Sequence, residues 1–277
     1  MPKNYIKSAK KDILSFFYDD ERKHWIYKYR DNLKSNVDGR KVFYLQQLKV
    51  LFENEYSHWN TGIALNELVG EGQLIKWNEY ITVGTKKKKR KLSLFRRPDV
   101  RYYIKNAKTI LEHNKSFDTD FGKTTGKWAE FLTEHMFLKF GFKIIDSHTN
   151  KFKNQEWKKT KNNLDFIVSK DDLYYGVEVK NRFEYITEEE FEIKMFGICK
   201  HLNLIPMCVF RMAPRAFTYK LYKIGGFTLI YKRKVLPIGF EKYARKIWED
   251  TLLPIQASNF LSEKAERLFL KWHEKHI

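Results

Sequence analysis

Two short hydrophobic stretches, residues 164–169 and 173–181, lie on either side of the polar pair Asp171–Asp172. Their lengths and the polar turn between them predict an antiparallel β-hairpin. A tight turn at the two aspartates places Lys170 opposite Leu173, and this pair sets the register for the rest of the hairpin. The register can therefore be followed residue by residue toward the open end.

At that open end, Asp165 is expected to lie directly across from Glu178. Side chains alternate along a strand, so Glu178 and Lys180 share one face, whereas Val177 and Val179 point to the other. Directly opposed Cβ atoms lie ~4.5–5.5 Å apart. Two carboxylates this close repel each other unless a cation lies between them, so the hairpin predicts a hard oxygen site with an ammonium group beside it.

The rest of the second half alternates between helix and strand patterns. This alternation predicts a mixed β-sheet with helices on both faces, so the fold class is α/β. The expected elements are a helix over 126–140, a strand over 142–146, a lysine-rich loop over 147–162, a helix over 186–203, strands over 204–212 and 225–232, and a helix around 265–272.

The first half reads as mainly helical and ends in a strand pair. Val42, Leu45, Leu48 and Phe52 have helical spacing, and a second amphipathic helix closes at Gly70 and Gly72. Strands are expected over 75–83 and 91–97, around a basic tip. This order resembles the winged helix-turn-helix family across roughly residues 38–110. The polar break at 113–125 suggests two domains, 1–117 and 118–277.

The chain carries 53 Lys and Arg against 34 Asp and Glu, a formal net charge of +19. Residues 1–120 have 25 basic and 15 acidic side chains, and residues 121–277 have 28 and 19. Because both halves are basic, a polyanion touching both is the natural partner. Nucleic acid is favoured over an anionic membrane, since no basic amphipathic helix stands out. A lysine-rich coding bias is the alternative explanation.

Location is inferred from what the sequence lacks. The N-terminus has no secretory signal pattern, and no apolar run is long enough to span a membrane. Cys199 and Cys208 form no framework of disulfide or metal-ligand spacing and are expected in the core. We therefore expect a cytoplasmic, nucleoid-associated protein with no membrane partner.

The paired carboxylates and the amine suit hydrolysis of a phosphodiester bond. Mg²⁺ needs few protein carboxylates and completes its coordination with water and substrate oxygen. A bound metal lowers the pKa of a water ligand and neutralises charge that develops on phosphorus. Asp165 and Glu178 are thus the expected metal ligands. Lys180 is expected to orient or deprotonate the attacking water, or to stabilise the transition state.

These residues, Leu164-Asp165 and Glu178-Val179-Lys180, resemble the motif of the PD-(D/E)xK nuclease superfamily. Leu164 stands where the family has proline. The resemblance implies a restriction-endonuclease-like mixed sheet flanked by helices over 124–232, preceded here by the mainly helical winged-helix-like domain. It also implies Mg²⁺-dependent DNA cleavage, with Mn²⁺ as a substitute, and a catalytic glutamate on the first helix, for which Glu130 is the candidate; Glu134 follows one turn later.

Two basic segments are candidate contacts to double-stranded DNA, since phosphate neutralisation dominates non-specific affinity. The first is the strand-pair tip, which also resembles a nuclear-localisation signal, and the second is the loop before the hairpin. Both could instead be solvated loops. The candidate residues are Lys86, Lys87, Lys88, Lys89, Arg90, Lys91, Arg96, Arg97, Lys158, Lys159 and Lys161; Lys151 and Lys153 belong to the same loop.

A Mg²⁺-dependent endonuclease, in particular a type II restriction enzyme, is the leading interpretation, and a homodimer would supply two sites for two strands. A structure-specific nuclease for junctions or repair and a catalytically inactive DNA-binding protein are the alternatives. A purely structural explanation of the motif, without catalysis, is a surface salt bridge between Asp165 and Lys180. A second acid-x-lysine, Glu192-Ile193-Lys194, falls on a predicted helix and is expected to be solvated surface.

Overall fold

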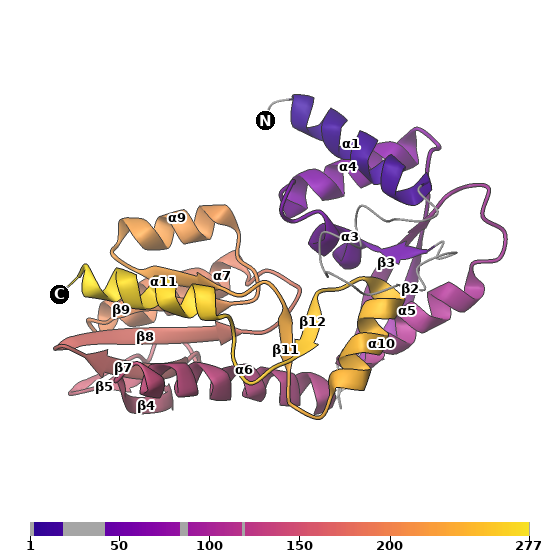
Figure 1. Ribbon diagram of the computed structural model, residues 1–277. Helices are drawn as coiled ribbons and strands as arrows, with labels where there is room; N and C mark the ends of the chain where they lie inside the picture. The colour runs from indigo at the N-terminus through magenta and orange to yellow at the C-terminus, as the bar shows by residue number, and fades with distance from the viewer. Residues whose placement is uncertain (1–2, 19–41, 84–87, 118–119, 277) are drawn as a thin grey trace. The chain divides into compact units, whose positions relative to one another are not determined.

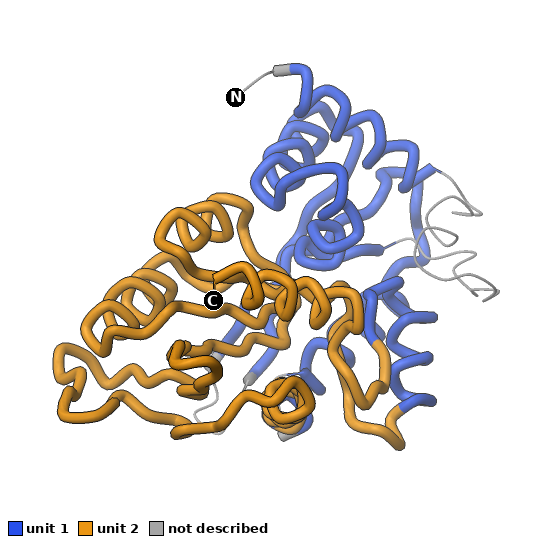
Figure 2. The backbone as a smooth tube through the Cα atoms, turned by 60° about the vertical axis from the view of Figure 1, so that its left-hand side comes forward, with its two compact units in different colours: residues 1–123, 241–255 blue, residues 124–240, 256–277 orange. Residues whose placement is uncertain are grey.

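The computed structural model of the protein describes residues 3–18, 42–83, 88–117 and 120–276. It is a mixed α/β chain that divides into two compact units (Figure 2). Unit 1 comprises residues 1–123 and 241–255, and unit 2 comprises 124–240 and 256–277. The division expected from the sequence at 117/118 differs mainly in assigning residues 241–255 to the second half.

Unit 1 combines helices with a three-stranded antiparallel sheet in the order β1-β3-β2. Its elements are α1 (Lys3–Tyr18), β1 (Phe43–Tyr44), α3 (Leu45–Leu51), α4 (His58–Gly70), β2 (Ile75–Val83), β3 (Lys88–Arg96), α5 (Ile104–Phe117) and α10 (Glu241–Thr251). The helix expected from the spacing of Val42, Leu45, Leu48 and Phe52 is confirmed only over α3, where Leu48 is fully buried. Val42 and Phe52 lie outside it, because Phe43 and Tyr44 pair with β3 as a strand. The expected strand pair is also confirmed, because Ile75 pairs with Arg96 and Ile81 with Arg90.

Residues 241–255, which contain α10, are held in unit 1 by polar contacts as well as by buried side chains. His113 Nε2 on α5 lies 2.8 Å from Asp250 Oδ2 on α10. Gln47 Nε2 on α3 donates to the carbonyl oxygen of Thr251 at 2.6 Å. Trp248 is 1 % exposed. Helix α10 therefore completes the core of unit 1 although it is more than 120 residues away from α5 in sequence.

Unit 2 is built on a five-stranded mixed sheet in the order β10-β9-β8-β7-β4 (Figure 1). Its elements are α6 (Asp120–Lys139), β4 (Lys143–Thr149), β5 (Lys151–Phe152), β6 (Gln155–Glu156), β7 (Leu164–Lys170), β8 (Leu173–Lys180), α7 (Glu188–Phe191), the π-helix η1 (Glu192–Ile198), α8 (Cys199–His201), β9 (Ile205–Phe210), α9 (Arg215–Lys223), β10 (Phe227–Ile230), β11 (Lys234–Leu236), β12 (Ile255–Ala257) and α11 (Glu263–Glu274). Strands β4, β7 and β8 are antiparallel, whereas β8, β9 and β10 are parallel.

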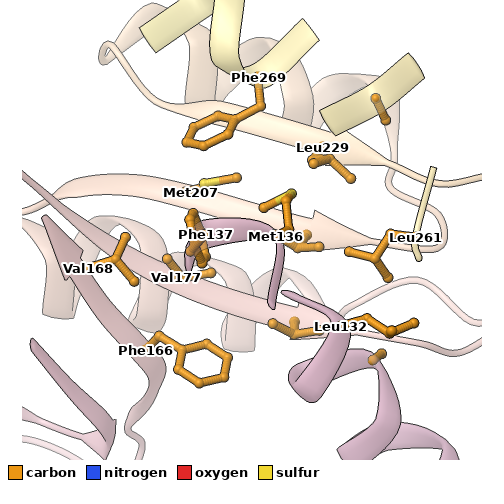
Figure 3. Packing of buried hydrophobic residues seen from close by; sticks show 14 of the residues in the cluster. Leu132, Met136, Phe137, Phe166, Val168, Val177, Met207, Leu229, Leu261 and Phe269 are labelled. Carbon is orange, nitrogen blue, oxygen red and sulfur yellow. The ribbon is translucent and has the colours of Figure 1, made fainter. Parts of the chain in front are cut away.

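Each face of this sheet is covered by helices, as the alternation of patterns predicts. One hydrophobic cluster joins α6 and α11 to strand residues such as Val168, Val177 and Met207 (Figure 3). The other cluster joins the α7–η1–α8 segment and α9 to the opposite face, through residues such as Ile167 and Cys208. Cys199 and Cys208 are both buried free cysteines, which confirms their expected place in the core.

A glycine in β8 determines how closely the second helical layer approaches the sheet. A Cβ atom on Gly176 would lie 2.7 Å from Cys199 Sγ and 2.9 Å from Leu164 Cδ1. Both neighbours are buried side chains with relative exposures of 0 %. Only glycine therefore fits at this point of the strand, two residues before Glu178.

Replacing Gly176 by alanine is expected to destabilise the protein by ~1–3 kcal/mol, because the added methyl group overpacks the core. Urea denaturation of the full chain measures the effect. Gly126→Ala on α6 is the matched control, since a Cβ there meets no atom within 4 Å. This control is expected to gain roughly 0.5–1 kcal/mol, because alanine replaces glycine in a helix. Equal effects of the two substitutions would contradict the packing explanation.

Helix α11 is attached to the hairpin turn by a buried polar chain. His273, in the last turn of α11, is fully buried. Its Nδ1 lies 2.6 Å from the Tyr175 hydroxyl, and its Nε2 lies 3.0 Å from Asp171 Oδ2. The C-terminal helix and the β7–β8 turn are therefore fixed relative to each other within unit 2.

Candidate active site

The β7–β8 hairpin has the register expected from the sequence. Lys170 pairs with Leu173, and the ladder continues without a shift to Phe166 and Val177. Asp171 and Asp172 have φ angles of +51° and +59°, as a two-residue turn that matches the strand twist requires. The paired ladder ends at Phe166 and Val177, one residue before the expected pair of Asp165 and Glu178. The two carboxyls nevertheless lie close enough for the charge of Asp165 to raise the pKa of Glu178, so both are found at the open end of the hairpin.

Asp165 is largely buried, with 9 % of its surface exposed. The backbone N–H of Val179 donates to its Oδ2 at 2.6 Å. Burial raises the pKa of the Asp165 carboxyl, and the negative charge of Glu130 acts in the same direction. The charges of Lys180 and Lys194 and the Val179 hydrogen bond oppose that increase without cancelling it. The ionised form of Asp165 is thus held at a site that disfavours it.

Glu178 is completely buried and is in contact with two lysine side chains. Lys194 Nζ donates to its Oε1 at 2.6 Å and to its Oε2 at 2.7 Å. Lys180 Nζ donates to Oε1 as well. Burial raises the pKa of the Glu178 carboxyl, and the negative charge of Asp165 raises it further, whereas the two ammonium groups oppose the increase.

Lys180 links Glu178 to a second acid, Glu190, at 3.2 Å. Burial alone would lower the pKa of this lysine, but Glu178, Asp165 and Glu190 together outweigh burial and raise it. Lys180 is therefore an ammonium ion at neutral pH. Of the roles expected from the sequence, this protonation state favours charge stabilisation and water orientation over deprotonation of the attacking water.

Glu190 lies in the first turn of α7. The Thr187 hydroxyl oxygen accepts a hydrogen bond from its backbone N–H at 3.1 Å, which confirms the expected helix start. Its carboxylate pairs with Lys180 and, at 3.3 Å, with Arg182. Burial tends to raise the pKa of Glu190, but these cations outweigh that effect and lower it. Glu190 therefore joins the site as an ionised partner of Lys180.

Lys194 belongs to the site, although the sequence predicts it on a solvated surface. The prediction is wrong, because only 6 % of its surface is exposed. It lies on the π-helix η1, on the same buried side as Phe191, Met195 and Ile198. A lysine within an apolar stripe of helical spacing is the signal that could have identified it, since a buried ammonium group needs an anionic partner.

Glu130 is placed on α6 near Asp165, as its electrostatic effect on that carboxyl indicates. Its Oε2 lies 3.7 Å from His148 Nε2, and its side chain is 25 % exposed. Across the described ranges, His, Cys, Asp and Glu side chains form no group of three or more arranged to hold a metal ion.

The residues that the structure does bring together nevertheless suit a hard cation chemically. Asp165 and Glu178 offer oxygen donors, and the buried thiols nearby have raised pKa values, owing first to burial and then to the charge of Glu178. Oxygen-only donors favour Mg²⁺ over thiolate-preferring metals. Two carboxyls whose ionised forms are both disfavoured by burial are also the groups that a divalent cation would stabilise most.

The candidate DNA contacts of unit 1 fall into two groups. Lys86 and Lys87 lie outside the described residues, whereas Lys89 and Lys91 on β3 are exposed. Lys88 begins β3. The three arginines, Arg90, Arg96 and Arg97, make contacts within the unit.

Arg90 donates to Asn114 Oδ1 at 3.0 Å. Arg96 donates to the carbonyl oxygens of residues 97, 98 and 100 and stacks 4.4 Å from the ring centre of Tyr103. Arg97 forms an ion pair with Asp99 at 2.6 Å. These contacts give the arginines a structural role in unit 1.

The lysines before the hairpin are displayed on the loop that contains β5 and β6. Lys158 and Lys161 are exposed, and Lys158 Nζ lies 3.4 Å from Glu156. Lys159 Nζ lies 5.4 Å from the ring centre of Trp157. Because their ammonium groups reach solvent, they remain able to meet a polyanion.

Asp165→Asn is expected to raise the melting temperature at about pH 8 by roughly 2–4 °C, the shift that ~1 kcal/mol produces in a protein of this size. A raised carboxyl pKa means that ionisation is less favourable in the folded chain than in the unfolded chain. Ionised Asp165 therefore lowers stability at high pH, and this penalty disappears as the pH falls below its raised pKa. Thermal melts across pH should show the gain from asparagine shrinking in acid; a gain that is independent of pH would contradict the assignment.

No helix in the described part of the chain is long and apolar enough to cross a membrane. Comparisons with protein-family models, curated proteins and solved structures give no match to this chain.

Proposed function

We propose that the protein is a Mg²⁺-dependent DNA endonuclease. The observation that carries this proposal is the group formed by Asp165, Glu178 and Lys180 at the open end of the β7–β8 hairpin. Burial raises the pKa values of the Asp165 and Glu178 carboxyls, and the neighbouring Lys180 side chain is an ammonium ion. A surface salt bridge would need none of this burial.

The order of elements in unit 2 supports the proposal. Helix α6 precedes the antiparallel strands β4, β7 and β8, and the α7–η1–α8 segment leads to the parallel strand β9. This arrangement is similar to the core expected for the PD-(D/E)xK nuclease superfamily, with the acidic and lysine residues on its hairpin. The order of α1, β1, α3, α4, β2 and β3 in unit 1 is likewise similar to a winged helix, which would serve duplex binding.

In this mechanism, Asp165 and Glu178 would hold the metal ion. A bound Mg²⁺ ion would supply an activated water and would neutralise charge on the phosphate. Lys180, as an ammonium ion, hydrogen-bonds phosphate oxygen or the attacking water and stabilises the charge that develops in the transition state. Glu130 lies near Asp165 and adds negative charge to the cation site.

The biological role proposed is that of a type II restriction enzyme, with double-stranded DNA as the substrate. The net charge of +19 supports binding to a polyanion. Among the described candidate contacts, the exposed lysines are Lys89, Lys91, Lys158, Lys159 and Lys161. A homodimer would give one site to each DNA strand.

Cleavage of supercoiled plasmid, linear plasmid and four-way junction DNA with Mg²⁺ or Mn²⁺ tests the proposal. Parallel reactions contain EDTA or Lys180→Met purified in the same way. Discrete fragments that disappear in both controls support a restriction enzyme. Cutting of the junction alone would replace that role by structure-specific cleavage. Tight DNA binding without cleavage of any substrate would overturn the enzymatic proposal in favour of a DNA-binding protein.

A further inference from the structure

Lys194 is a second ammonium group beside the proposed metal ligand Glu178. Its Nζ donates to both oxygens of that carboxylate, at 2.6 and 2.7 Å, and lies 3.9 Å from Glu190. Lys180 reaches only one of the two Glu178 oxygens. Lys194 is therefore the cation that engages Glu178 most completely.

The position of Lys194 is determined by rigid surroundings. The π-helix η1 carries it, and Met195 and Ile198 on the same segment are 1 % and 0 % exposed. π-Helical turns are uncommon and are found frequently at functional sites. A flexible surface lysine could withdraw from an incoming cation, whereas an amine held within a packed layer stays close to it.

Three cations already offset most of the negative charge around the two carboxylates. Asp165, Glu178, Glu190 and the nearby Glu130 are acidic, and Lys180, Lys194 and Arg182 pair with them or lie within their field. A divalent cation that binds Glu178 must therefore enter a site where an ammonium group already contacts both carboxylate oxygens. Coulomb repulsion between that ammonium group and the metal opposes binding.

We propose that Lys194 is a positioning residue that holds the Glu178 carboxylate in place and, through its fixed positive charge, weakens the site's affinity for divalent cations. This inference rests on the proposed metal-dependent function. The two amines then have different roles. Lys194 binds the Glu178 carboxylate, and Lys180 is available to contact the phosphate of the substrate. A weak cation site suits a nuclease in which the metal ion completes its coordination with substrate oxygen.

Calorimetric titration of Mn²⁺ and Mg²⁺ into the full chain, without DNA, tests the proposal. Lys194→Met and Lys194→Gln remove the charge, and glutamine keeps hydrogen-bond donors toward Glu178. Both variants are expected to bind the cation about tenfold more tightly than the native chain. Lys194→Arg keeps the charge and is expected to bind with unchanged affinity, as is Lys200→Met, which removes an exposed lysine six residues further along the chain.

The outcomes separate this inference from the proposed function. If the native chain binds the cation and the two neutral variants bind equally or more weakly, the role of Lys194 is overturned while the metal site stands. If the native chain binds no cation, the metal site fails, and the inference fails with it. Thermal melts verify that each variant is folded. Loss of folding in both neutral variants would contradict the proposal, because Lys194 would then be a requirement of the fold.

Discussion

Replacing Lys180 by methionine should lower the rate of Mg²⁺-dependent DNA cleavage by about 10²–10³-fold, the loss typical when one group that stabilises transition-state charge is removed. Methionine keeps the unbranched shape of the side chain and removes only the ammonium group. The fold should persist, because Glu178 keeps its hydrogen bonds to Lys194. The measurement is single-turnover cleavage of plasmid DNA with enzyme in excess.

Two comparisons make this result specific. DNA affinity, measured without metal, should change little, because one partly buried lysine adds little to binding by a chain with a net charge of +19. Lys143→Met removes an exposed lysine from β4 in the same sheet and should leave the rate unchanged. A Lys180→Met enzyme that cuts at the native rate would show that the amine contacts Glu178 for structural reasons only.

Replacing Glu178 by glutamine should abolish cleavage and destabilise the protein by ~3–5 kcal/mol, the loss typical when one partner of a buried ion pair is removed. Asp165 is hydrogen-bonded to a backbone N–H group, whereas Glu178 is bonded to the ammonium groups of Lys180 and Lys194. Glutamine would therefore leave Lys194, with only 8 % of its side chain exposed, without its closest carboxylate. Urea denaturation of the full chain measures the loss. Glu274→Gln, at an exposed position on α11, should change the free energy of unfolding by less than ~0.5 kcal/mol.

The double variant Glu178→Gln/Lys194→Met identifies the origin of that loss. If the uncompensated ammonium group of Lys194 is the cause, removing it should restore much of the stability lost in the single variant. Additive losses in the double variant would instead indicate that the two side chains contribute to stability independently. Cleavage should remain absent in either case, because the metal ligand is missing.

The hairpin could be predicted in detail because its information is local. The turn at Asp171–Asp172 fixes one pair, and the two-residue period then fixes the following pairs as far as Phe166 and Val177, next to the carboxylates. A bulge would have broken the prediction, and strand β4, which shifts register between Ile144 and Asp146, shows that this sheet does contain one. The charged end of the hairpin was thus accessible from the sequence.

The residues that surround the hairpin could not be predicted from the sequence in the same way. The acid-x-lysine pattern on a helix predicts a solvated Lys194, whereas the apolar positions around it indicate burial. The segment folds as a π-helix, and no simple residue period signals that geometry. Burial of Lys194 further depends on Glu178, which lies 16 residues earlier on a different element. Pairings of this kind arise from the tertiary fold, so local patterns do not specify them.

The arginines next to the basic tip illustrate another limit. Judged by charge alone, Arg96 and Arg97 are DNA-contact candidates as good as the lysines before them. In the structure, Arg96 donates to three carbonyl oxygens and Arg97 pairs with Asp99. A guanidinium group has five donors in a fixed plane, so it readily joins backbone segments, and its presence in a basic run indicates DNA contact less directly than an exposed lysine does.

The return of residues 241–255 to unit 1 has a consequence for any attempt to separate the two units. A fragment that ends at residue 123 would lack the Asp250 carboxylate opposite His113 and the Thr251 carbonyl that accepts from Gln47. It would also lack Trp248, one of the largest fully buried side chains of the chain. Cutting the gene between the two halves should therefore yield an N-terminal piece that aggregates, whereas co-expression with the C-terminal piece would let the missing helix complement it in trans.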